Sequence, residues 1–212
     1  MGDAVRAAGR ETRDYPHHAR DRAAGDRRRA QLLDAAIAEL AASGWHATSV
    51  RSIADRAGMQ PSGVLHHFPN KAALLLAALE HADAEARELL EAAAGQPEPT
   101  GAAALDGILA VLRLYTERPA LARLSIAVAQ EAVAADHPAA DWARTRRRAI
   151  RASLEAALAA PDAGLAADLD VAREAAGLFA LIEGAVAHWL SDPDHLDPVA
   201  VVAHHLDRLR AG

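Results

Sequence analysis

The chain has 212 residues and a net charge of −6, and 51% of its residues are hydrophobic while only 3% are aromatic. This length accommodates one sizeable core, or two small cores that share a helix. Alanine and leucine, which favour helices, dominate the apolar residues, and β-branched and aromatic residues are scarce, so an all-α fold is predicted. The absence of cysteine excludes disulfide frameworks, cysteine-based zinc sites and thiol catalysis.

Charge and hydropathy also indicate where the protein works. No uncharged run approaches the ~20 residues of a membrane helix, and the N-terminus lacks the apolar core of a signal peptide, so a cytoplasmic protein without membrane contact is expected. Residues 1–71 contain 11 Lys/Arg against 8 Asp/Glu, whereas the remaining residues contain 12 against 21. A basic head on an acidic body fits nucleic-acid binding at one end.

The first 25 residues show no apolar period, so a mobile basic arm is predicted over 1–25. The arginines of the arm and of the residues directly after it, densest at Arg27–Arg29, could follow DNA phosphates or enter a minor groove. A solvated tail is the alternative. A first helix is expected to follow Asp26 and to end near Gly44, with leucine, isoleucine and alanine at helical spacing.

Two short helices around a tight turn are predicted next. Thr48 or Ser49 can cap a helix over 50–57, and Gly58 suits the left-handed residue that ends it. Pro61 then suits the first turn of a second helix.

The second short helix has an inner and an outer face. Val64 and Phe68, four residues apart, form the inner ridge. The outer face, which in such motifs enters the major groove, carries polar or small residues: Gln60, Ser62, Gly63, His66 and His67.

In order and spacing, residues 45–74 resemble the operator-binding region of the TetR family of bacterial transcriptional regulators. The resemblance implies an N-terminal three-helix helix-turn-helix DNA-binding domain (26–72) joined to a helical ligand-binding and dimerisation domain (73–212). The family usually has tyrosine at the position of Leu65 and often has glycine at that of Ser62, which affects sequence preference. The DNA-binding residues expected are Thr48, Ser49, Arg51, Gln60, Pro61, Ser62, Gly63, His66, His67 and Lys71.

Lys71 and the adjacent histidines have competing explanations. A lysine at a helix N-terminus opposes the helix dipole, so a phosphate shared with the free amides would explain Lys71; an ordinary solvated lysine is the alternative. In the resembling family, the matching lysine contacts the DNA backbone. His66 and His67 point about 100° apart on a helix, so they cannot chelate one metal from the same face. Contact with base or phosphate is expected for them, and surface polarity is the alternative.

Beyond the motif, the pattern predicts a long helix over 70–94 and a loop over 95–101. Further helices are expected at about 102–117, 119–135, 138–159, 166–191 and 196–210, separated by proline-containing segments. The 70–94 helix would connect the DNA-reading head to the body and act as the lever between them.

Two of the later helices indicate a homodimer. The helix around 174–190 is apolar on most of its circumference and must be covered on more than one side. A four-helix interface from two chains is expected, as in the resembling family; burial within one chain is the alternative. The residues assigned to it are Gly177, Ala180, Gly184, Ala187, Trp189, Val202, Leu206 and Leu209.

A cavity for a small molecule is expected among the helices from 102 to 191. Its candidate lining is Leu105, Ile108, Leu112, Tyr115, Leu124, Val128, Trp142, Phe179, Ile182 and Glu183, with His188 as a further polar contact; plain core is the alternative for each. Glu183 needs a partner or a wet cavity in so apolar a helix, and either a cationic ligand group or an intersubunit arginine would serve. The arginines over 144–151 suggest a solvated helix face, or else an anionic ligand.

No pattern typical of a catalytic triad, a phosphate loop or a metal site stands out, so no enzyme activity, metal or cofactor is expected. The leading interpretation is a homodimeric regulator, most often a repressor in the resembling family, that leaves a palindromic double-stranded DNA operator when a small, mostly apolar effector binds. The alternatives are constitutive DNA binding without an effector, and a helical enzyme or binding module whose motif is only structural.

Overall fold

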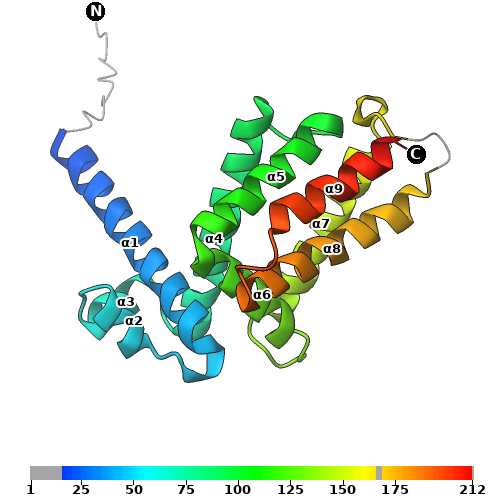
Figure 1. Ribbon diagram of the computed structural model, residues 1–212. Coiled ribbons are helices and arrows are strands. Elements are labelled where there is room, and N and C mark those ends of the chain that lie inside the picture. Colours follow the sequence, from blue (N-terminus) through cyan, green and yellow to red (C-terminus); the bar gives the residue numbers. More distant parts are fainter. Residues whose placement is uncertain (1–15, 166–168, 212) are drawn as a thin grey trace, which may run out of the picture.

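The computed structural model describes residues 16–165 and 169–211, and over these residues the chain forms helices and no strands (Figure 1). The predicted all-α class is confirmed. The elements are α1 (Pro16–Ala47), α2 (Val50–Arg56), α3 (Pro61–His67), α4 (Lys71–Ala94), α5 (Gly101–Glu117), α6 (Pro119–Glu131), α7 (Ala140–Ala159), the 3-10 turn η1 (Pro161–Ala163), α8 (Val171–Ser191) and α9 (Pro198–Ala211).

The first helix is longer than predicted. It begins at Pro16 and not after Asp26, so residues 16–25 are helical, and only residues 1–15 of the expected arm lie outside the described residues. The segment is rich in alanine and arginine, which favour a helix even where no apolar face requires burial. The expected break is present, because Gly44 has φ 72° and ψ 174° inside α1.

The N-terminal head, which comprises α1, α2 and α3, does not have a core of its own. Buried apolar side chains of α1 to α4 form one continuous cluster with residues of α6 and the start of α7. In this cluster, Ile53 of α2 and Val64 of α3 belong together with Leu124 and Val128 of α6. Helix α1 packs extensively against α6 as well as against α4 and α2. The helix-turn-helix is therefore fixed to the body through α4 and α6.

The second buried cluster lies in the body, where α5, α7, α8 and α9 meet. Helices α8 and α9 lie side by side, as Figure 1 shows in orange and red. Two predicted helices are shorter than expected, because α6 ends at Glu131 and α8 begins at Val171. The Asp170 carboxylate accepts the main-chain N–H of Arg173 at 3.2 Å and so caps the start of α8. None of the described helices is long and apolar enough to cross a membrane.

Candidate nucleic-acid interface and effector cavity

Helix α2 is capped by serine and held against α1. The Ser49 hydroxyl accepts the Ser52 N–H at 3.0 Å, and the Ser52 hydroxyl accepts the Ser49 N–H at 3.0 Å, which completes a reciprocal capping box. Thr48 plays a different part from the one predicted. Its side chain is buried, and its hydroxyl donates to the Gly44 carbonyl at 2.8 Å, so it closes the end of α1.

The turn between α2 and α3 follows the predicted geometry. Gly58 has φ 63°, and no atom lies within 4 Å of where its Cβ would be, so backbone conformation alone favours glycine there. Helix α3 begins at Pro61. Val64 is fully buried and Phe68 is 5% exposed, so they anchor the inner side of α3 in the head's core.

The outer side of α3 is open to solvent. Gln60, Ser62, His66 and His67 are exposed, and Leu65 among them is 47% exposed. Helix α3 packs against α2, on which Ser49 and Arg51 are exposed as well. Pro61 and Gly63 are partly covered. The structure therefore brings the expected DNA-binding residues together at α2 and α3, apart from Thr48, which is buried, and Lys71, which begins α4.

Basic side chains of α1 extend this surface. The guanidinium of Arg29 lies 5.2 Å from the centre of the Phe68 ring, beside the end of α3, and Arg27 and Arg28 are exposed. Phosphates on either side of a groove are the natural partners of such exposed cations. Arg6, Arg10 and Arg13 of the expected arm lie outside the described residues.

Lys71 has an internal partner, which neither the phosphate nor the solvated-lysine explanation included. Its Nζ donates to the carbonyl of Trp45 and lies 4.0 Å from the centre of the Trp45 ring. Burial lowers its pKa below the ordinary 10.5, and the negative charge of Glu131 opposes that change. Lys71 thus binds the end of α1 to the start of α4.

A cavity of about 1130 Å³ lies among α4, α5, α7 and α8, with α6 contributing to its wall. Its lining is mainly apolar, as expected for a small-molecule site. Seven of the residues predicted from the sequence line it: Ile108, Leu112, Tyr115, Trp142, Phe179, Ile182 and Glu183. Further lining residues that the sequence analysis did not assign to the cavity include Asp83, Arg87, Leu90, Ser125, Ile126, Arg146, Ser153 and Leu154.

Three predicted lining residues belong to the core instead. Leu105 is fully buried in the body cluster, and Leu124 and Val128 are buried between α6 and the head. Predicted His188 is exposed on α8 and is not among the lining residues. Apolar spacing indicated the buried faces of these helices, but it could not tell a face against a void from a face against another helix.

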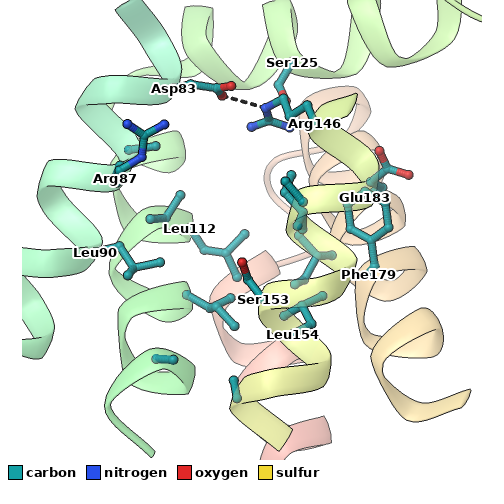
Figure 2. Close-up of a pocket in the computed structure, with 18 of the residues that line it drawn as sticks. Asp83, Arg87, Leu90, Leu112, Ser125, Arg146, Ser153, Leu154, Phe179 and Glu183 are labelled. Atoms are coloured by element: carbon teal, nitrogen blue, oxygen red, sulfur yellow. Dashed lines mark hydrogen bonds and ion pairs between the residues drawn. The ribbon is translucent and has the colours of Figure 1, made fainter. Parts of the chain in front are cut away.

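The polar end of the cavity is an ion pair between two helices. Figure 2 shows Asp83 of α4 and Arg146 of α7 facing each other, with Nε and Oδ1 2.6 Å apart, while leucines line the wall further along. Burial acts to lower the pKa of Arg146, but the nearby Tyr115 and Asp83 have the larger combined effect, so the pKa is raised above its ordinary value. The arginine segment is therefore not one solvated face: Arg146 faces the cavity, whereas Arg144 forms an exposed pair with Asp141.

The predicted dimer residues separate into two groups. Gly177, Ala180 and Gly184 are exposed on α8, and no atom lies within 4 Å of a Cβ built at either glycine. Val202 and Leu206 of α9, in contrast, are buried within the chain, which corrects their assignment to an interface between chains. The other three residues are partly covered: Ala187, Trp189 and Leu209.

Among the described residues, no three histidine, aspartate or glutamate side chains are placed to hold a metal ion. The rings of His66 and His67 are 5.6 Å apart and inclined at 70°.

Comparison with known proteins agrees with this arrangement of a head and a helical body. Residues 32–78 match the family model described as bacterial regulatory proteins, tetR family. Residues 101–211, more than half of the chain, match the model described as BetI-type transcriptional repressor, C-terminal. The chain belongs to the TetR family of bacterial transcriptional regulators. No curated protein matches it.

Several TetR-family structures have the same fold. A putative regulator from Rhodococcus sp. aligns with a TM-score of 0.67 and 23% identity over 86% of this chain and 98% of that one. The FadR regulator of Bacillus subtilis, solved with stearoyl-CoA, aligns with a TM-score of 0.65 and 20% identity over 86% and 97%. SmeT, the repressor of the Stenotrophomonas maltophilia multidrug efflux pump SmeDEF, aligns with a TM-score of 0.64 and 22% identity over 85% and 87%.

Proposed function

We propose that this TetR-family chain is a homodimeric repressor that binds a palindromic operator and is released from it by a small, mostly apolar ligand. We assign the chain no catalytic activity. The observation that carries it is the free outer surface of α3, where Gln60, Ser62, His66 and His67 are exposed while Val64 and Phe68 fix the opposite side in the core. A short helix held in this way is suited to a major groove.

Homodimerisation is supported by the uncovered strip of α8. Gly177, Ala180 and Gly184 leave a shallow, small-residue surface that permits close approach of another helix. One helix-turn-helix contacts only a few base pairs, and two copies about one helical turn apart raise both affinity and discrimination. A two-fold dimer would therefore match a palindromic site.

The ligand is proposed to occupy the cavity among α4, α5, α7 and α8. Its size and apolar lining suit a hydrophobic molecule, and the Asp83–Arg146 pair and Glu183 offer polar contacts. Among structures of this fold, one regulator is solved with stearoyl-CoA and another represses a multidrug efflux pump. Ligand binding would shift the dimer toward a state whose heads no longer match the operator spacing.

Fluorescence anisotropy with duplexes from the DNA upstream of the protein's own gene, at several salt concentrations, tests DNA binding. Ser62→Glu is the informative variant, because a carboxylate in the first turn suits the helix dipole but repels phosphates. It should weaken binding about tenfold or more while the fold is kept. Ala152→Glu, on the exposed side of α7, is the matched control and should bind as the wild type does. Equal binding by both variants would refute the assignment of α3.

The effector is tested by thermal shift and by release of the bound duplex. Long-chain acyl-CoA thioesters and hydrophobic drug-like compounds form the panel. A compound that both raises the melting temperature and releases DNA supports the proposal. If no compound does both, constitutive DNA binding is the better description.

A further inference from the structure

Trp45, near the end of α1, lies where three segments of the body meet the head. Its main-chain N–H donates to Oε2 of Glu131, the last residue of α6, at 3.3 Å. Its carbonyl accepts from Lys71, the first residue of α4, whose Nζ also lies over its ring. The ring of His137, between α6 and α7, meets the Trp45 ring edge-on at 5.7 Å.

The helices that carry or adjoin these contacts also line the cavity. Helix α4 contributes Leu90, α6 contributes Ile126, and α7 contributes Trp142. Glu131 ends the helix that carries Ile126, and His137 shortly precedes the helix that carries Trp142. A change of spacing among these cavity walls would therefore reach Lys71 and Glu131 through continuous helix, and His137 through the short turn that precedes α7.

Glu131 is the central group of this cluster. A Cβ at Gly44 would lie 3.1 Å from its Oε1, so the carboxylate sits against the bend of α1. His137 is 8% exposed, and its Nδ1 accepts the Ala139 N–H at 3.2 Å, which leaves the proton of the neutral ring on Nε2. That Nε2 is 3.6 Å from Oε2 of Glu131 and has no hydrogen-bond partner among the described residues.

We propose that Glu131 is a positioning residue that couples the cavity to the DNA-binding head, because its hold on the Trp45 N–H sets the angle at which α1 leaves the body. The proposal rests on the proposed function, since it explains how a ligand in the cavity would move the reading helices. While Glu131 accepts the Trp45 main-chain N–H, the head keeps the orientation that binds its half-site. When the cavity walls spread, the hold on Trp45 changes and the head reorients.

The direction in which Glu131→Gln changes the DNA affinity distinguishes this coupling from a simple electrostatic effect. Removal of a negative charge near a DNA-binding surface leaves binding unchanged or strengthens it. The neutral amide oxygen of glutamine accepts the Trp45 main-chain N–H more weakly than a carboxylate does. This loosening should instead weaken specific binding about three- to tenfold, because a loosened head must be ordered again on the duplex. Glu80→Gln is the matched control: Glu80 is exposed on α4, has no ion-pair partner among the described side chains, and should show only the electrostatic effect.

The position of the head is measured directly by pulsed electron paramagnetic resonance. Because the chain has no cysteine, Asp55→Cys on α2 and Arg148→Cys on α7 introduce two unique sites for nitroxide labels. The labelled chain is mixed with excess unlabelled chain, so that distances within one chain dominate. The Glu131→Gln chain should show a broadened or shifted distance distribution, and the Glu80→Gln chain should match the wild type.

The outcomes distinguish the two proposals. If Glu131→Ala, which has no acceptor for the Trp45 main-chain N–H, keeps the wild-type distances and DNA affinity, the coupling role is refuted. If the wild-type protein binds no duplex, the proposed function fails, while the distance distributions still decide whether Glu131 positions the head. Far-ultraviolet circular dichroism confirms that each variant is folded, and Glu131→Ala, which also removes the hydrogen-bond acceptor, should move the distances further.

Discussion

Replacing Gly184 with leucine tests whether the exposed strip on α8 is where two chains meet. Within one chain the change should be harmless, because no atom lies within 4 Å of a Cβ at this position. Leucine also favours the helix over glycine by about 0.8 kcal/mol. A leucine inserted into a close helix contact costs about 1–3 kcal/mol, and two-fold symmetry places it in the interface twice. The expected loss of association is therefore about 2–6 kcal/mol, or about 30-fold to more than 10,000-fold in the dimer dissociation constant.

Sedimentation equilibrium over a range of protein concentrations measures that constant. Ala152→Leu, which adds a leucine to the exposed side of α7, is the control for non-specific effects of surface hydrophobicity and should dimerise as the wild type does. Gly184→Leu should also bind DNA with the lower affinity of a single head. A Gly184→Leu protein that remains a tight dimer would refute the placement of the interface on this strip.

Three further predictions concern stability, each measured by urea or thermal unfolding. Gly58→Ala should cost about 1–2 kcal/mol because φ is 63° there, and Gly58→Asn should cost less; equal stability of all three proteins would contradict the turn geometry. Burial lowers the pKa of His137 below 6.5 despite Glu131, so the unfolded chain takes up a proton that the folded chain resists as pH falls below about 6.5. Stability should therefore decline in that acidic range, and His137→Asn should remove this part of the decline; an unchanged pH profile would count against it. Arg146→Met should be destabilising because it leaves Asp83 without its ion pair, and adding Asp83→Asn should recover about 1 kcal/mol; strictly additive effects would argue against coupling.

The head could be predicted closely because its signals are local. A serine that caps α2, a glycine at the turn and a proline that starts α3 each act within a few residues of the chain. Lys71 could not be understood in this way. Its partner Trp45 lies 26 positions earlier, and no spacing rule connects them. The start of α1 was misplaced for another reason, since residues 16–25 form helix without an apolar period that would announce it.

The cavity was predictable only in part, because a cavity depends on what lies across from a helix. Ile108 and Leu105 belong to the same apolar pattern of α5, yet Ile108 lines the cavity and Leu105 is fully buried in the core. The Asp83–Arg146 pair joins positions 63 residues apart, so the sequence placed Arg146 among solvated arginines. For α9, helical spacing identified the buried face containing Val202 but could not show whether its cover comes from the same chain.

The misplaced residues of α6 explain why this helix is suited to transmit a signal. Leu124 and Val128 were expected to line the cavity, but they are buried in the cluster that also contains the inner residues of the head. Ser125 and Ile126, on another face of the same helix, line the cavity. Helix α6 is therefore a wall shared by the cavity and the head, and it ends at Glu131 on Trp45. Because packed interiors resist compression, a ligand that displaces one face of this helix should move the other face with it.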